Sequence, residues 1–508
     1  MESLTADVVV VGGGNAALCA SLSARESVDR VLVVERAPFG LHGGNSAFTA
    51  GAMRVAYDGA DDIMRLVPDL HPDQLATTEF GCYPAEQFFS DLARVTEYRT
   101  DPDLADILVS RSFETLLWMR EKGVRFLPIY GRQAFKVEGK FTFWGGLTLE
   151  ASGGGPGLVA SLTTAAQREG IEILYGARAT ELVTDTGRVA GVVVKRQGQE
   201  VLIRAQAVVL ACGGFQSNVE WRTRYLGPGW DLAKVRGTRF NTGDGIRMAL
   251  DIGAMSWGQW SGAHAVGWEL NAPDFGELEV GDGFQKHSYP FGIMVNADGE
   301  RFLDEGADFR NYTYAKYGRE ILAQPGHFAW QIFDAKVSHL LRDEYRIRQV
   351  TKVTAPTLEK LAEQLDGVDA DAVVRNVEAY NRAVDTGVPF NPNQRDGRGT
   401  RGLAVEKSNW ANTIDEPPFE AYAVTCGITF TFGGLRITPE AEVVDTEGAT
   451  IPGLFACGEL VGGIFYFNYP GGSGLTNGSV FGRIAGARAA ATAAAALPAG
   501  QGRGSGRA

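Results

Sequence analysis

Three small residues and one acid near the N-terminus have the types and spacing needed to hold a pyrophosphate and a ribose. Gly12, Gly14 and Ala17 form a G-x-G-x-x-A motif between an apolar run and an Ala/Leu-rich stretch. Glycine allows a tight turn and lets the backbone approach a pyrophosphate, whose charge is stabilised by the N-terminus of the following helix. Glu35 ends the next apolar run, where a carboxylate accepts ribose hydroxyls. The pattern predicts FAD or NAD and disfavours NADP; the alternative is a glycine-rich turn followed by a surface glutamate.

Further glycine-rich segments are spread along the chain and favour FAD. They lie at 43–46, 50–53, 241–245, 453–459 and 471–475. Glycines at this many separate points suit a long cofactor lying extended across a sheet. The helix expected to begin near Thr476 would place its positive end near a flavin ring. A nicotinamide-using reductase is disfavoured, because a second strand–GxGxxG–helix unit is not seen.

These motifs need a parallel sheet to position them, and the N-terminal pattern predicts one. The runs Asp7–Val11, Asn15–Ser27 and Val31–Val34 predict strand, helix and strand, the opening unit of a doubly wound sheet. A hairpin-like insertion is predicted at Val189–Val194 and Val201–Ile203, and a further buried strand at Ala207–Leu210.

The middle of the chain differs in composition from both ends, which indicates an inserted domain. From about Trp257 to Tyr422 it is rich in aromatic and charged residues and has few glycine pairs. Two helices are expected there, one behind a Thr357 N-cap and one carrying Val373 and Val377. We predict the α/β class, with a split Rossmann-like FAD-binding domain and an inserted α+β capping domain, the active site lying in the cleft between them. The predicted parts are FAD-binding at 1–257 and 426–490, capping at 258–425, and a disordered tail at 491–508.

Composition and charge exclude several other classes of protein. Glycine accounts for 65 of 508 residues, about twice the usual share. It has no G-X-Y period, which excludes collagen. The 44% hydrophobic content excludes general disorder. The net charge of −13 without a basic stripe argues against nucleic acid as a partner.

Targeting and metal-binding patterns are also not seen in the sequence. No apolar run reaches the roughly 18 residues of a membrane span. The N-terminus enters a strand without a basic segment, so we expect no transmembrane segment, no signal peptide and a cytoplasmic location. The five cysteines are scattered, without haem or iron–sulfur spacing. We therefore expect reduced thiols and no metal.

Longer motifs carry a resemblance that covers nearly the whole chain. They include VVVVGGGNAALCA, GGNSAFTAGAMR, NTGDG, GIMVNADGERFLDEGADFRNYTYAKYG and LFACGELVGGIFYFNYPGGSGLTNGSVFGR. In order and spacing they resemble the flavoprotein family of fumarate reductases and succinate dehydrogenases, and within it most of all the tricarballylate dehydrogenases. The FAD contacts that this resemblance implies are Gly12, Gly14, Ala16, Glu35, Asn45, Ser46, Ala50, Gly51, Ala179, Asp244, Glu459, Gly474 and Leu475. Asn45 stands where some relatives attach FAD through a histidine, which implies non-covalent FAD.

The resemblance also implies an acid/base residue. In such enzymes a hydride moves between flavin N5 and one carbon, and a proton moves between an arginine and the next carbon. Arg310 follows the G-x-R-F-x-x-E motif Gly299–Glu305, one residue later than in the fumarate reductases. We expect Arg310 to be this residue; the alternative is an arginine paired with Asp304 or Asp308.

Several other residues are implied to hold the substrate. His264 matches a histidine that binds a substrate carboxylate, with a core histidine as the alternative, and His287 is a second candidate. Arg54 is expected either to add a positive charge to the site or to lie at the surface. Two positions depart from the family: Thr429 begins the segment that replaces its His-His-Thr-Met-Gly-Gly, and Tyr469 replaces a substrate-binding arginine. With Tyr466 they predict a wall of hydroxyl groups.

The implied reaction is the desaturation of tricarballylate, a polycarboxylate, to cis-aconitate. Electrons would then pass to a separate acceptor, which is a protein, a quinone or oxygen. The Tyr-Pro-Gly run at 469–471 is also similar to that of 3-ketosteroid dehydrogenases, so the alternative substrate is a neutral cyclic ketone or enone. A flavin electron carrier without a substrate of its own is the alternative from another class.

Overall fold

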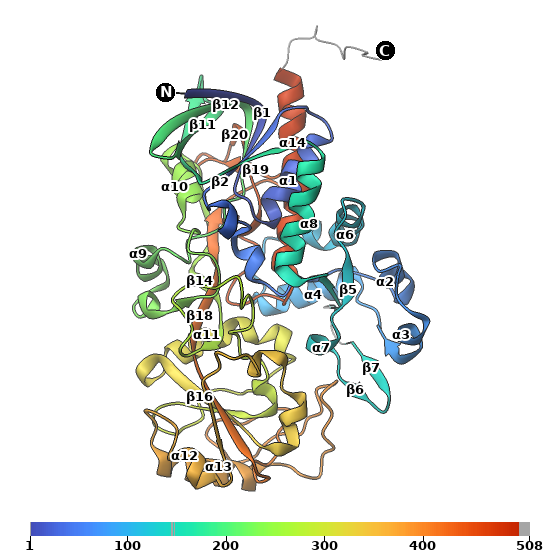
Figure 1. The fold of residues 1–508 in the computed structure, drawn as a ribbon, viewed down its shortest axis with the longest axis vertical. Helices are drawn as coiled ribbons and strands as arrows, with labels where there is room; N and C mark the ends of the chain where they lie inside the picture. Colours follow the sequence, from blue (N-terminus) through green and yellow to red (C-terminus); the bar gives the residue numbers. More distant parts are fainter. Residues whose placement is uncertain (1, 144–145, 147, 497–508) are drawn as a thin grey trace.

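An eight-stranded sheet forms the upper end of the molecule in Figure 1. The computed structural model describes residues 2–143, 146 and 148–496. The sheet runs β10–β11–β12–β1–β2–β9, with β20 paired to β12 and β19 paired to β20. Its strands are β1 (Glu2–Val11), β2 (Val31–Glu35), β9 (Glu172–Tyr175), β10 (Ala177–Asp185), β11 (Arg188–Arg196), β12 (Gln199–Leu210), β19 (Glu442–Val444) and β20 (Thr450–Ala456). The pairs β9–β2, β2–β1, β1–β12 and β12–β20 are parallel, as a doubly wound sheet requires.

The predicted N-terminal unit is confirmed, because α1 (Asn15–Arg25) connects β1 to the parallel strand β2. The hairpin is present as β11 and β12, which pair antiparallel. The prediction of two separate strands at 201–203 and 207–210 is wrong. They form the single strand β12, because its parallel pairing with β1 continues from Val201 to Leu210.

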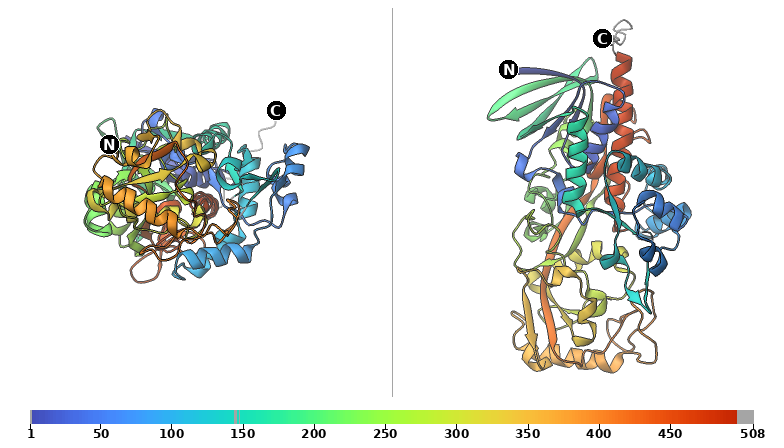
Figure 2. Two further views of the ribbon diagram at one scale, coloured as in Figure 1. Left: turned by 90° about the horizontal axis from the view of Figure 1, so that it is seen from below. Right: turned by 45° about the vertical axis from the view of Figure 1, so that its right-hand side comes forward.

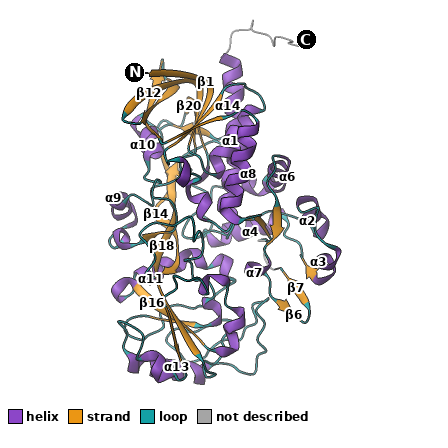
Figure 3. Ribbon diagram, in the orientation of Figure 1, coloured by secondary structure: helices purple, strands orange, loops and turns teal. Residues whose placement is uncertain are grey.

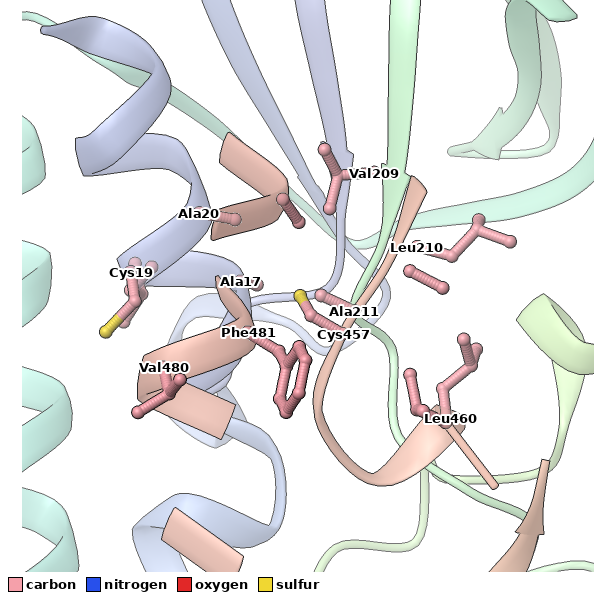
Figure 4. Packing of buried hydrophobic residues seen from close by; sticks show 14 of the residues in the cluster. Ala17, Cys19, Ala20, Val209, Leu210, Ala211, Cys457, Leu460, Val480 and Phe481 are labelled. Atoms are coloured by element: carbon pink, nitrogen blue, oxygen red, sulfur yellow. The ribbon is translucent and has the colours of Figure 1, made fainter. Parts of the chain in front are cut away.

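Helices α1, α8 (Gly154–Arg168) and α14 (Ser473–Ala496) lie side by side next to this sheet (Figures 1 and 2). Glycines in α14 let its backbone touch α1: a Cβ at Gly482 would lie 2.5 Å from the carbonyl oxygen of Ala16. Beneath this contact, Phe481 of α14 packs into an apolar core with Leu210 and Cys457 (Figure 4). Helix α14 continues to Ala496, so the first part of the predicted tail is helical; residues 497–508 lie outside the described part.

A second, six-stranded sheet extends from the middle of the molecule to its lower end (Figure 3). Strand β18 (Phe419–Leu435) is its centre. The other strands are β13 (Lys234–Val235), β14 (Ser256–Glu269), β15 (Ile293–Val295), β16 (Phe328–Phe333) and β17 (Lys352–Ala355). Both helices expected in the middle of the chain are present, as α12 (Leu358–Ala362) and α13 (Ala370–Ala383). Thr357 caps α12 by accepting a hydrogen bond from the Lys360 amide.

The boundaries predicted at 257/258 and 425/426 fall inside β14 and β18. These two strands pair antiparallel from Ser256 opposite Leu435 to Glu269 opposite Val424. The chain therefore passes between the upper and lower parts of the molecule along a two-stranded ribbon. The lower part has its own hydrophobic core, which includes Ile332, Leu361 and Val377.

A third region, residues 52–151, flanks both parts on the right of Figure 1. The composition of the sequence did not distinguish it. Its elements are β3 (Ala52–Met53), α2 (Ala60–Leu66), α3 (Pro72–Thr77), β4 (Thr78–Glu79), α4 (Ala85–Val95), α5 (Pro102–Ser110), α6 (Ser112–Glu121), β5 (Phe126–Pro128), α7 (Tyr130–Gln133), β6 (Lys136–Val137), β7 (Lys140–Thr142) and β8 (Leu149–Ala151). The remaining helices are α9 (Val219–Trp221), α10 (Asp244–Asp251) and α11 (Tyr314–Leu322). None of the helices in the described ranges is long and apolar enough to cross a membrane.

Candidate active site

A cavity of about 110 Å³ lies at the carboxyl ends of β1 and β2. It is lined by the turn between β1 and α1, by Glu35 and by Asp244. Gly12 has a φ of +120°, and a Cβ there would lie 2.3 Å from the Ala211 carbonyl oxygen, so this position requires glycine. A Cβ at Gly13 would lie 2.5 Å from a carboxylate oxygen of Glu35. The small residues therefore bring the acid and the helix N-terminus to one cavity.

The carboxylate of Glu35 is buried and accepts a hydrogen bond from the Ala37 amide at 2.6 Å. Burial raises the pKa of Glu35 to about 7. Burial also raises the pKa of Glu459 to about 7. The carboxylate of Asp244 is paired with Arg178 and Arg36 at 2.8 and 3.0 Å.

A larger cavity of about 170 Å³ adjoins the first and shares Ala16, Asn45, Ser46 and Glu459 with it. The first turn of α14 opens into this larger cavity through Gly474 and Leu475. Asn477, in the same turn, has a buried side-chain oxygen without a hydrogen-bond partner among the described residues. We call the larger space the substrate cavity and the smaller one the cofactor cavity.

The two cavities fit an FAD molecule. The glycine turn and Glu35 suit the pyrophosphate and ribose. The positive end of α14, together with the side-chain oxygen of Asn477 that has no partner among the described residues, suits the polar edge of a flavin ring. Of the thirteen residues predicted to contact FAD, those that line one or both cavities are Gly12, Gly14, Ala16, Glu35, Asn45, Ser46, Ala50, Ala179, Asp244, Glu459, Gly474 and Leu475. Gly51 lines neither cavity; a Cβ there would lie 2.6 Å from the Gly154 backbone, so it serves packing.

Three arginines and one aspartate also line the substrate cavity. They are Arg132 from α7, Arg236, Asp282 and Arg310. Asp282 accepts from Arg236 at 2.6 Å through one oxygen and from Arg132 at 2.6 Å through the other. Burial would raise the pKa of Asp282, but the two guanidinium groups keep it below its ordinary value. The carboxylate of Asp282 therefore stays charged although it is buried.

Arg310 lines the cavity as the sequence predicts. One of its nitrogens donates to the Arg132 carbonyl oxygen at 3.0 Å, and another lies 3.4 Å from Nδ1 of His287. Its side chain is not paired with Asp304 or Asp308, the predicted alternatives, because Asp304 binds Ser408 and Asp308 pairs with Arg94. Burial lowers the pKa of Arg310 below its ordinary value.

Arg54 lies in neither of its two expected places. It is fully buried but does not line the substrate cavity. Its guanidinium donates to the Gly471 carbonyl at 2.8 Å and to the hydroxyls of Tyr83 and Tyr312 at 2.9 and 3.3 Å. Both hydroxyls donate to Asp91. Arg54 therefore joins the segment before α14 to the region that contains α4.

Two of the predicted substrate residues lie one layer behind the cavity wall. His264 is fully buried against three lining residues, Tyr314, Phe430 and Tyr469, with ring centroids 4.8–5.1 Å away. Neither of its ring nitrogens has a hydrogen-bond partner in the described part of the chain. Burial, with Arg236 nearby, lowers the pKa of His264 well below its ordinary value. His287 lies behind Arg310.

The predicted wall of hydroxyl groups is present in part. Thr429 and Tyr469 line the substrate cavity, whereas Tyr466 lines neither cavity and is partly exposed. Tyr314, which the sequence did not single out, also lines the cavity, and its hydroxyl contacts that of Tyr469.

The sequence analysis missed Arg132, Arg236 and Asp282 as site residues. They come from three segments that are remote in sequence, so no local spacing marks them. Arg236 lies close before the predicted NTGDG segment, which is the one local hint. Among the described residues, no group of three or more His, Cys, Asp or Glu side chains could hold a metal ion.

Comparisons with known proteins agree on one family. Residues 7–475 match the FAD binding domain family. The chain is 31% identical to a probable fumarate reductase, Ifc3, of Shewanella frigidimarina over 95% of this chain and 74% of that protein. It resembles the open conformation of a flavocytochrome c3 fumarate reductase with a TM-score of 0.71 and 28% identity, over 97% of this chain and 79% of that chain. It shares the fold of the 3-ketosteroid Δ1-dehydrogenase of Sterolibacterium denitrificans, with a TM-score of 0.74 and 24% identity over 96% and 99% of the two chains. The chain therefore belongs to the FAD binding domain family and is an FAD-dependent oxidoreductase related to the fumarate reductases.

Proposed function

We propose that this protein oxidises a carbon–carbon bond next to a carboxylate, with tricarballylate as substrate and cis-aconitate as product. The observation that carries the proposal is the group of three arginines that line the substrate cavity, of which Arg236 is buried and Arg132 and Arg310 are half-buried. Arg132 and Arg236 pair with Asp282. Arg310 has no carboxylate partner among the described residues, and the other lining acid, Glu459, also lines the cofactor cavity. The arginine cluster therefore holds an excess of positive charge, which a substrate with several carboxylates would balance.

The arginines would divide the work of binding and proton transfer. FAD, when bound, supplies the redox chemistry by accepting a hydride from one substrate carbon. Arg310 takes the proton from the neighbouring carbon at its guanidinium group, and burial favours this role because it lowers the pKa of Arg310. Arg132 and Arg236 hold carboxylates, and one hydroxyl of the Tyr314–Tyr469 pair donates to a remaining polar atom of the substrate. The two electrons then leave to a separate acceptor: a protein, a quinone or oxygen.

A neutral cyclic ketone or enone is the second candidate substrate. The paired hydroxyls of Tyr314 and Tyr469, which line the cavity beside Phe430, favour it. Such a pair can donate a hydrogen bond to a ketone oxygen, and an aromatic wall can cover a ring. The arginine cluster would have no partner on such a substrate, and for this reason we place the polycarboxylate first.

The test is anaerobic mixing of the oxidised, FAD-loaded enzyme with tricarballylate, succinate or a neutral cyclic ketone, one at a time. We expect tricarballylate to bleach the oxidised flavin absorbance, and added salt to weaken its binding more than that of the ketone. An unchanged spectrum with tricarballylate, in a preparation that dithionite reduces normally, would rule out this substrate. Bleaching by the ketone alone would establish the second candidate.

A variant pair tests the role of Arg310. We expect Arg310→Lys to slow flavin reduction by roughly 100-fold or more, since general acid–base groups contribute about that much. The matched control is Arg319→Lys, a half-exposed arginine of α11 that pairs with Glu320. Equal rates in the two variants would remove Arg310 from the proton transfer.

A further inference from the structure

A third, smaller cavity of about 30 Å³ is also lined by Arg310. It shares Arg132 and Arg310 with the substrate cavity and adds His287 and Arg342. The rest of its lining is largely apolar and includes Phe291 and Trp410. One water needs about 10–15 Å³ on this measure, so the space holds a group of two or three heavy atoms. We call it the Arg342 cavity.

Arg342 lines this cavity, and its guanidinium makes no hydrogen bond to the part of the chain that the structure describes. Its side chain is 5% exposed. None of its three nitrogens has a hydrogen-bond partner among the described residues. Glu344 lies 3.2 Å away, but its nearer oxygen also makes no hydrogen bond in the described part. A buried guanidinium in this state is costly, because its five donors have been taken out of water without replacement.

The backbone holds Arg342 firmly in this position. Its amide donates to the Ser288 hydroxyl at 3.1 Å, and the Ser288 amide donates to the Tyr345 hydroxyl at 2.8 Å. Tyr345 in turn donates to the Gln331 side chain of β16. The backbone that carries these unpaired donors is therefore fixed by the fold.

The charges around the cavity do not balance. Arg310 has no carboxylate partner in the described structure, and Asp282 is already shared by Arg132 and Arg236. Glu344 is therefore the acid nearest to Arg342. Burial, followed by the charge of Arg310, lowers the pKa of Arg342 to about 9. Burial and the surrounding arginines also lower the pKa of His287 well below its ordinary value, so His287 is neutral.

We propose that the Arg342 cavity is a binding site for one anionic group of carboxylate size, held between Arg342 and Arg310. A carboxylate matches the planar fork of a guanidinium, and it would satisfy donors that have no other partner. Two sources supply this chemistry: a carboxylate of the substrate that reaches past Arg310, or a free small anion. The first source rests on the proposed function, whereas the second does not.

The test is crystallography of the FAD-loaded enzyme in bromide, whose anomalous scattering locates the ion. We expect a bromide peak between Arg342 and Arg310. Arg342→Met should weaken this site by roughly 10- to 100-fold, the range for losing a hydrogen bond to a charged group, and Arg342→Lys should weaken it less. The matched control is Arg346→Met, a surface arginine on the same segment that pairs with Asp343, and it should leave the peak unchanged.

A second arm identifies the source. Tricarballylate added to the bromide crystals either displaces the ion, which assigns the cavity to a substrate carboxylate, or leaves it in place, which assigns it to a free anion. Both results support the site. A wild-type cavity that stays empty of bromide, or a peak of equal height in Arg342→Met, would overturn it. None of these readouts needs turnover. If tricarballylate failed to reduce the flavin, it would be ruled out as the substrate, but the bromide test of the Arg342 cavity would be unaffected.

Discussion

The buried acid Glu35 should make FAD binding depend on pH in a defined direction. Its carboxyl lies at the end of β2 in the cofactor cavity, and its pKa is raised by burial from the ordinary 4.5 to about 7. At 1.36 kcal/mol per pH unit, keeping this carboxyl ionised costs the folded apoprotein about 3 kcal/mol more than it costs the unfolded chain. The contribution of Glu35 to apoprotein stability is therefore complete below pH 4.5 and is lost as the pH rises through about 7.

Bound FAD should reverse part of this cost, because ribose hydroxyls donate to the ionised carboxylate. FAD binding then lowers the pKa of Glu35, and affinity rises with pH. A complete shift would strengthen binding by about 25-fold between about pH 5.5 and about pH 7.5. The measurement is titration of apoprotein with FAD, followed by quenching of flavin fluorescence across this range.

The variant Glu35→Gln should remove this part of the pH dependence and should weaken binding most above pH 7. Glu459 also has a raised pKa of about 7 and borders both cavities, so a smaller dependence should remain in the single variant. The control is Glu172→Gln, an exposed residue of the neighbouring strand β9. An unchanged pH profile in Glu35→Gln would refute the reasoning, because Glu35 would then not hold the ribose as a carboxylate.

Two further changes test the packing around the site. Gly482→Ala should lower the thermal midpoint of the FAD-loaded enzyme, because the added Cβ would lie 2.5 Å from the Ala16 carbonyl oxygen and overpacking costs about 1–3 kcal/mol. The control is Gly40→Ala, because a Cβ at Gly40 would have nothing within 4 Å. Equal midpoints in the two variants would contradict the close contact of α1 and α14. His264→Phe should keep the KM for substrate within about twofold, because the His264 ring lies behind the cavity wall. The variant should also fold, because phenylalanine avoids the free-energy cost of burying two nitrogens that have no partner among the described residues. A large rise in KM would instead show that His264 reaches the substrate.

Several residues that line the cofactor cavity could be predicted from the sequence because they are close together along the chain. Gly12, Gly14 and Glu35 lie on adjacent turns of one βαβ unit, so spacing alone places them at one edge of the sheet. Gly51 is the exception. Its small size serves the contact with Gly154, and a glycine in a motif does not reveal whether it faces a cofactor or another backbone.

The substrate side could not be predicted in the same way, because it is built from long-range contacts. Arg132, Arg236 and Asp282 meet only after three remote segments have folded together. Arg54 shows the converse error: it follows a cofactor segment directly, but Tyr83 and Tyr312 from distant segments hold it away from the cavity. Hydrophobic patterning also missed that β12 is one strand, since its weakly apolar middle is fixed by pairing with β1.

The ribbon of β14 and β18 has a mechanical consequence. It joins the two ends of the molecule through paired strands, so a swing of the lower part requires the ribbon to flex. Its pairing register shifts between Gln259 and Ala263, and again between His264 and Ala265. Such bulges are where a ladder bends most easily. The facing stretch of β18, 430–432, lines the substrate cavity. A bend of the ribbon at these bulges would therefore also move the stretch of β18 that lines the substrate cavity.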